Sequence, residues 1–214
     1  MRAIMALAAM LFSLTAFAQY EVGKDYIELA VPLKTGSDKI QVDEYFSYSC
    51  GHCYKFEPVI AQWKKTLADD VELVQTPVAW QLVNKGQRGY AMVALAKAFY
   101  TAKALKVLDK VHMPIFDGIF VEQKNMSDED ELKALFEKHG VDPKKFEKVF
   151  NSFGVTTQVR VAHSRSRGAK ISGTPEIVVD GRYVVSARKA GGQANMLKIT
   201  DFLINKIRQE KTAK

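Results

Sequence analysis

The sequence predicts an α/β protein with the element order βαβ–ββα, in which a helical block is inserted between the two halves. Two changes of hydrophobic periodicity lead to this prediction. A strand–helix–strand pattern over residues 40–80 gives way to helical spacing, and strand spacing returns after residue 168. The third observation is Asp180–Gly181 between two β-branched runs, which is typical of a two-residue hairpin turn.

The first half is predicted to be two parallel strands joined by a helix. Residues 40–46 and 71–80 are rich in strand-forming residues. Pro58 lies inside the helical pattern between them and is expected to kink the helix. The helix itself is indicated by apolar residues three and four positions apart, which are Cys53, Phe56, Ile60, Trp63 and Leu67.

The inserted block is predicted to contain several helices that pack through apolar stripes. A capping signal over residues 127–130 begins one helix, Asp142 with Pro143 begins the next, and a basic segment to about Lys170 forms another. The stripes are Met92, Leu95, Ala96 and Phe99; Leu132, Leu135, Phe136 and His139; and Phe146, Val149, Phe150 and Phe153.

The second half is predicted to be the hairpin followed by a closing helix. The closing helix carries one apolar face, made of Met196, Ile199, Leu203 and Ile207. The predicted boundaries are residues 19–84 and 169–214 for the two halves and residues 85–168 for the inserted helical domain. We find no internal repeat.

Residues 1–18 have the features of a secretory signal peptide. Arg2 precedes an uncharged, largely apolar run that ends in Ala16-Phe17-Ala18, a pattern that a signal peptidase can cut. An N-terminal anchor helix is the alternative. Cleavage would leave a chain from Gln19 in which no stretch resembles a membrane span, so we expect a soluble protein in an oxidising, exported compartment.

Charge and composition exclude several classes of protein. The formal net charge is +7, and the basic cluster in residues 160–170 lacks interleaved aromatic residues. We therefore interpret that cluster as a solvated helix face and expect no nucleic-acid partner. A chain of this length can bury a core without covalent help, so its two cysteines are not needed as a structural framework.

The two cysteines lie three residues apart, as Cys50-Gly51-His52-Cys53. A structural disulfide here would close a very short loop and stabilise the chain little. A closed zinc site needs four ligands, and the other histidines are isolated in the sequence, so we predict no metal. Redox chemistry remains: Cys50 at a helix N-terminus is favoured as a thiolate, a protonated His52 would add to this effect, and Cys53 lies one turn inside on the apolar face.

The chain resembles the DsbA family of periplasmic thiol-disulfide oxidoreductases, which have a thioredoxin fold. The resemblance is carried by EYFSYSCGHCYKFEP, by Thr174–Pro175 before the Asp–Gly hairpin, by the helical insertion and by the export signal. Two departures are visible. Gly51–His52 matches eukaryotic disulfide isomerases, whereas many family members have Pro–His, and Thr174 stands where the best-known members have valine.

The resemblance implies an exported dithiol oxidase that transfers its Cys50–Cys53 disulfide to unfolded or reduced exported proteins. It also implies a membrane-bound reoxidising partner of the DsbB type, a periplasmic location, a monomer, and no cofactor beyond the redox-active disulfide. Two alternatives stay open. One is a disulfide isomerase or reductase in the same compartment, and the other is a peptide-binding chaperone that uses the Thr174–Pro175 edge.

Glu44 is the candidate buried acid, because relatives place such an acid on this strand beneath the disulfide. A carboxylate there could exchange a proton with Cys53. Asp43 must face the opposite side of the strand, so one of the two acids is expected to point outward. The position of a partner lysine in relatives corresponds to Gln75, so a buried Glu44 should have a raised pKa. An ordinary surface acid is the alternative.

Pro175 completes the predicted site. The resemblance implies a cis Thr174–Pro175 bond that faces the disulfide, with the Thr174 backbone and Gly51 in the substrate-binding surface. A trans turn proline is the alternative. Glu176 follows directly, and the sequence offers no physical reason for an acid there.

Overall fold

A mixed five-stranded sheet with the strand order β1-β5-β4-β2-β3 carries the candidate site. The computed structural model describes residues 20–80 and 87–213. The strands are β1 (Ile27–Glu28), β2 (Ile40–Phe46), β3 (Val71–Pro77), β4 (Glu176–Val179) and β5 (Tyr183–Ser186). The helices are α1 (Gly51–Lys64), α2 (Gln87–Ala104), α3 (Leu108–Phe120), α4 (Glu129–Lys138), α5 (Pro143–Phe150), α6 (Phe153–Gly168), α7 (Ala187–Ala190) and α8 (Gln193–Thr212).

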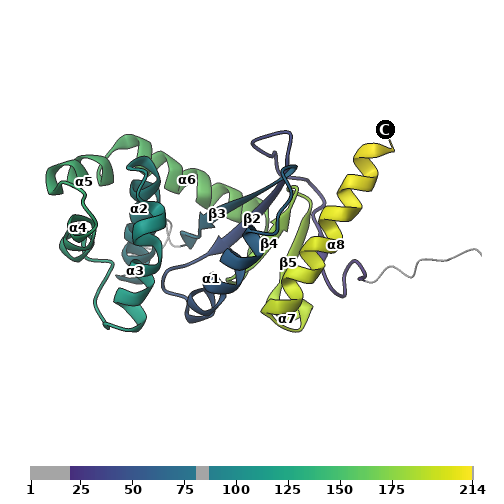
Figure 1. Cartoon of the computed structure of the whole chain (residues 1–214), viewed down its shortest axis with the longest axis horizontal. Helices are drawn as coiled ribbons and strands as arrows, with labels where there is room; N and C mark the ends of the chain where they lie inside the picture. Colours follow the sequence, from purple (N-terminus) through teal and green to yellow (C-terminus); the bar gives the residue numbers. More distant parts are fainter. Residues whose placement is uncertain (1–19, 81–86, 214) are drawn as a thin grey trace, which may run out of the picture.

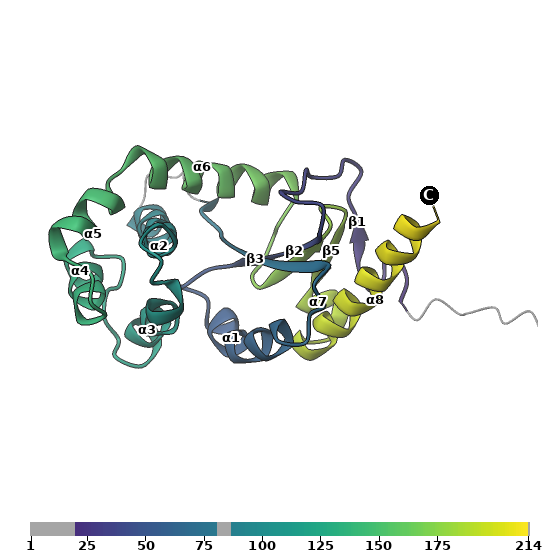
Figure 2. The ribbon, with the colours of Figure 1, turned by 45° about the horizontal axis from the view of Figure 1, so that its top comes forward.

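The order of the elements confirms the predicted βαβ–ββα thioredoxin fold with a helical insertion. Strand β2 pairs in parallel with β3 and antiparallel with β4, and β4 pairs antiparallel with β5. Helices α1, α7 and α8 lie on one side of the sheet, whereas α6 crosses the other side (Figure 2). Helices α2 to α5 stand together at one end of the sheet, beyond the N-terminal end of α1 (Figure 1).

Strand β2 is buried along its whole length because helices cover both faces of the sheet. The expectation that either Asp43 or Glu44 points outward is therefore wrong, since both are 0% exposed. Asp43 faces α6: Arg165 Nη2 of that helix and Gln41 Nε2 of the same strand each donate to its Oδ2 at 2.8 Å. Burial raises the pKa of Asp43 in spite of the Arg165 charge.

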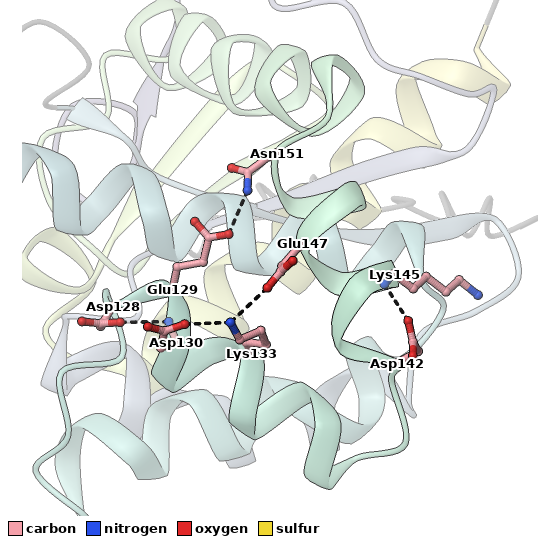
Figure 3. Close-up of polar contacts among 8 residues, drawn as sticks. All are labelled: Asp128, Glu129, Asp130, Lys133, Asp142, Lys145, Glu147 and Asn151. Atoms are coloured by element: carbon pink, nitrogen blue, oxygen red, sulfur yellow. Dashed lines mark hydrogen bonds and ion pairs between the residues drawn. The ribbon is translucent and has the colours of Figure 1, made fainter.

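The two predicted helix starts in the insertion are confirmed. Asp128 caps α4 by accepting from the backbone N–H of Asp130, and Asp142 caps α5 by accepting from that of Lys145, both at 2.8 Å (Figure 3). Lys133 then joins the two helices, with its Nζ 2.7 Å from Asp130 Oδ1 and 3.0 Å from a carboxylate oxygen of α5.

Several local expectations differ from the structure. Phe153 does not extend the apolar stripe of α5, because it is the first residue of α6 and is 82% exposed. Helix α1 contains Pro58 and ends at Lys64, before Leu67. The second strand ends at Pro77, opposite Phe46, where its partner β2 also ends.

Some predictions lie beyond what the structure describes. The signal peptide falls outside the described residues, and so does the boundary predicted at residues 84 and 85. Within residues 20–80 and 87–213, no helix has both the length and the apolar character needed to cross a membrane.

Candidate active site

Cys50 is the N-cap residue of α1, as the motif predicted. Its backbone is extended, and its sulfur accepts the backbone N–H of Cys53 at 3.4 Å. The pKa of Cys50 is lowered from 9.0 to about 5. The hydrogen bond with the Cys53 side chain is the largest cause, and the backbone N–H groups of Cys53 and His52 add to it, while partial burial opposes it. Cys50 is thus suited to be a thiolate at neutral pH.

Cys53 lies one turn inside α1 and is 0% exposed. It packs in the same apolar cluster as Phe46 and Tyr48. Burial raises its pKa above the ordinary value of a thiol, and the neighbouring Cys50 sulfur raises it further. The two free thiols therefore differ in the way that their positions in the motif predicted: one is accessible and acidic, and the other is buried and neutral.

The Thr174–Pro175 peptide bond is cis, which confirms that prediction. The Cys50 thiol donates to the carbonyl oxygen of Thr174 at 3.2 Å, so this loop lies against the reactive sulfur. Because a carbonyl oxygen cannot donate to a thiolate, this contact belongs to the thiol form of Cys50.

Glu176 explains how the loop before Pro175 is held. Its carboxylate is 6% exposed and accepts the backbone N–H and the hydroxyl of Ser172, both at 3.3 Å. Burial raises its pKa, and these hydrogen bonds act in the opposite direction. Glu176 therefore braces the segment that presents Thr174 to Cys50.

Gly51 and His52 form the first turn of α1 and differ in their surroundings. A Cβ on Gly51 would lie 3.7 Å from the ring of Phe120, so the end of α3 approaches this turn closely. Phe120 stacks on Tyr54, with ring centroids 5.2 Å apart. His52 is exposed, and its backbone carbonyl accepts from Gln193 Nε2 at 2.7 Å.

Glu44 lies on the face of β2 that points toward α1, and Gln75 lies beside it on β3. Gln75 Nε2 donates to Glu44 Oε2 at 2.9 Å and to Glu57 Oε1 at 3.0 Å. The pairing of Glu44 with Gln75 confirms the predicted position. Burial, and then the nearby Glu57 charge, raise the pKa of Glu44 well above its usual range, whereas the Gln75 hydrogen bond lowers it.

Three residues of this region were not predicted: Glu57, His112 and Tyr48. His112 Nε2 lies 3.0 Å from Glu57 Oε1, an ion-pair distance without hydrogen-bond alignment, and its Nδ1 lies 2.7 Å from Tyr48 Oη. An acid on the apolar face of α1, four residues after Cys53, was a signal that could have revealed Glu57. No local signal shows that His112 of α3 meets it. We refer to Glu44, Gln75, Glu57, His112 and Tyr48 as the buried polar cluster.

The site as a whole can open and close a disulfide. The accessible Cys50 can exchange with an external thiol, and the buried Cys53 is close enough to compete for it. Among residues 20–80 and 87–213, no group of three or more His, Cys, Asp or Glu side chains is placed to hold a metal ion.

Known proteins resemble this chain in both sequence and structure. Residues 41–198 match the family model described as a DSBA-like thioredoxin domain. The thiol:disulfide interchange protein DsbA of Pseudomonas aeruginosa is 34% identical over 208 residues, which cover 96% of this chain and 94% of that protein. The DsbA of Bordetella pertussis is 38% identical over 202 residues, 92% of each chain.

Solved structures agree with these sequence relatives. The crystal structure of Pseudomonas aeruginosa DsbA has a TM-score of 0.82 and 33% sequence identity, and the match covers 90% of this chain and 97% of that one. The oxidoreductase DsbA of Xylella fastidiosa has a TM-score of 0.78 and 30% identity, with 89% and 98% covered.

Proposed function

Because the chain belongs to the family of DSBA-like thioredoxin domains and is a thiol:disulfide oxidoreductase, we propose that it acts as an exported dithiol oxidase. One observation carries the oxidase direction: Cys50 sits at the N-terminus of α1 with a pKa lowered to about 5. A stabilised thiolate favours the reduced form of the protein and makes Cys50 a good leaving group, so its disulfide is readily given up.

The reaction proceeds in two exchanges. A substrate thiolate attacks Cys50 Sγ, the Cys50–Cys53 bond breaks, and Cys53 leaves with the electron pair and takes up a proton. A second substrate thiolate then attacks the substrate sulfur of the mixed disulfide, and Cys50 leaves as a thiolate. The substrate gains a disulfide and loses two electrons, which the protein retains as its dithiol.

The proposed substrates are reduced or unfolded exported proteins that bind as extended segments. The Thr174 backbone and the first turn of α1 at Gly51 supply the surface next to Cys50. The protein would work as a monomer in the periplasm after cleavage of residues 1–18. A membrane-bound partner of the DsbB type would accept the two electrons and restore the disulfide.

The oxidase activity is tested with a reduced, unfolded protein that contains two cysteines. Stoichiometric oxidised enzyme is added without glutathione, and mass spectrometry counts the thiols of both proteins. We expect one substrate disulfide for each oxidised chain, and none with Cys50→Ser. Binding of the unfolded protein that is unchanged by Cys50→Ser, with no transfer of disulfide by the wild type, would support the chaperone alternative instead.

The Gly51–His52 dipeptide favours a second candidate, a disulfide isomerase or reductase that is kept reduced. Thiol trapping of Cys50 and Cys53 in intact cells separates the two functions. An oxidase should be recovered mostly with its disulfide formed. Recovery mostly as the dithiol would support the isomerase or reductase.

A further inference from the structure

A histidine from the helical insertion enters the buried polar cluster beneath the active site. His112 of α3 is 9% exposed, and its ring packs at 5.2–5.9 Å against the rings of Phe46, Tyr48, Phe99 and Phe116. Its two nitrogens lie at contact distance from Tyr48 Oη and Glu57 Oε1. The imidazole therefore links α3 to α1 and to the segment that follows β2.

The cluster brings two buried acids together with one basic side chain. Glu44 and Glu57 are both buried and share one neutral amide, Gln75, which uses its Nε2 to donate to each of them. Donated hydrogen bonds satisfy carboxylate oxygens but do not neutralise a charge, and an unpaired buried carboxylate is costly. Of the five side chains in the cluster, only His112 can carry a positive charge.

Glu57 also lies where it can exchange a proton with the Cys53 thiol. The two residues are four positions apart in α1 and both are buried, so their Cβ atoms lie on one face of the helix, about 5–6 Å apart. Cys53 takes up a proton when it leaves the disulfide and must lose that proton when it attacks Cys50 again. A fully buried thiol cannot exchange this proton directly with bulk water, so it needs a positioned acid–base group.

We propose that His112 is a positioning residue for proton exchange at Cys53: it holds the Glu57 carboxylate in place on the buried face of α1. The resolution of mixed disulfides then depends on how the helical insertion sits against α1. This inference rests on thiol–disulfide exchange through Cys50 and Cys53 and does not depend on the oxidase direction.

Other ionisable groups surround His112 or its partners from each packed element. Burial raises the pKa of Glu44 of β2, and it also raises the pKa of Tyr48. Asp117 of α3 is engaged by Tyr54 Oη at 2.8 Å. Glu57 is thus the carboxylate in direct contact with His112.

The test follows the resolving step alone. Reduced protein is mixed rapidly with excess oxidised glutathione and quenched with acid, and mass spectrometry counts the mixed disulfide and the internal disulfide between pH 5 and pH 9. We expect His112→Gln to slow resolution at pH 7 by roughly tenfold to a hundredfold, within the range for acid–base assistance. Its pH profile should move upward, because the variant removes the only side chain of the cluster that can carry a positive charge.

Two controls separate positioning from packing. His139→Gln, in the same insertion but outside the cluster, should leave the profile unchanged. Glu57→Gln should slow resolution at least as much as His112→Gln, and the double variant should be no slower than Glu57→Gln alone. Two results would overturn the proposal. One is a double variant in which the two reductions in the resolving rate add up, and the other is a pH profile of His112→Gln with the wild-type midpoint.

If His112→Gln does not fold, the same measurement on Tyr48→Phe tests the proposal. This variant removes only the hydroxyl that contacts His112 Nδ1. A midpoint moved in the same direction supports the proposal, and an unchanged profile overturns it. Formation of the first mixed disulfide at Cys50 should be normal in every variant. A failed oxidase assay together with a His112-dependent resolving step would reject the proposed direction of reaction and leave this inference standing.

Discussion

The reactivity of Cys50 is set by groups that can be removed one at a time. The hydrogen bond from Cys53 is the largest cause of its lowered pKa, and the backbone N–H groups of the first turn come after it. Replacement of the buried partner should therefore raise the pKa without restoring the ordinary value.

We expect the thiolate absorbance of the reduced wild type to titrate near pH 5. In Cys53→Ala the midpoint should move upward but stay below that of a free thiol, because the helix N-terminus remains. Alkylation followed by peptide mapping should label Cys50 first at mildly acidic pH. Preferential labelling of Cys53 would contradict the assigned roles.

The brace at Glu176 gives a second prediction for a single residue. Glu176→Ala removes the acceptor of the Ser172 N–H and hydroxyl, so it should lower the free energy of unfolding by about 0.5–1.5 kcal/mol. Glu176→Gln keeps an acceptor oxygen, so its free energy of unfolding should fall by a smaller amount. Denaturant melts of the two variants measure the difference, and equal losses would argue against a hydrogen-bonded brace.

Single residues were predictable where the evidence was local. Cys50 and Cys53 follow from their spacing at a helix start, whereas Gln75 was found through the partner lysine that relatives carry at this position. Asp43 was misjudged because alternation along a strand does not tell whether the second face is covered. Burial of that face depends on α6, whose residue Arg165 is more than a hundred positions away in the sequence.

Among the elements, the hairpin between β4 and β5 has the most specific turn requirement. Asp180 and Gly181 have φ values of +51° and +65°, as a two-residue turn of this hand needs. A Cβ on Gly181 would lie 2.2 Å from the carbonyl oxygen of Leu33, which is backbone and cannot move aside easily.

Gly181→Ala should therefore lower the free energy of unfolding by about 2 kcal/mol or more, through backbone strain plus this clash. Gly191→Ala is the matched control, because its φ is +74° but its Cβ would meet open space. Its free energy of unfolding should fall by only about 1 kcal/mol, from backbone strain alone. Equal losses in urea melts would show that the contact with Leu33 carries no cost.

The elements that could be predicted are those with long, regular patterns. Strands β2, β4 and β5 and helix α8 fall where the apolar spacing placed them, and α1 and α5 also form there but end before Leu67 and Phe153. Helix α3 was not predicted, although Val111 and Ile115 on it have helical spacing, because Pro114 interrupts the pattern. Strand β1 has two residues and α7 has four, too few for any period to show.

At the scale of the whole molecule, the active site lies at the junction of the sheet and the helical insertion. Phe46 and Tyr48 from the sheet side pack with Phe116 of α3 in one aromatic cluster that also buries Cys53. The sequence predicted both parts and their order. It could not predict how they dock, because this contact joins residues far apart in the chain, and the buried polar cluster lies in that junction.

The same thiolate links the redox state to the stability of the molecule. Folding lowers the pKa of Cys50 to about 5, below the value of about 8.5 in an unfolded chain. The reduced form gains stability that is complete above the unfolded pKa and is lost as the pH falls through the folded one. The disulfide form has no such anion. Cys53, whose pKa is raised, lowers stability only above about pH 8.5.

The most direct test is a pair of denaturant melts, of the reduced and the oxidised protein, at pH 7.5 and again at pH 4. The contribution of ring closure does not depend on pH and cancels between the two conditions. We expect the reduced protein to be the more stable at pH 7.5, with an advantage that shrinks by about 1–3 kcal/mol at pH 4, after allowance for solvent screening of a partly exposed thiol. An oxidised form that is clearly the more stable at pH 7.5, or a difference that is the same at both pH values, would contradict an oxidase driven by the Cys50 thiolate.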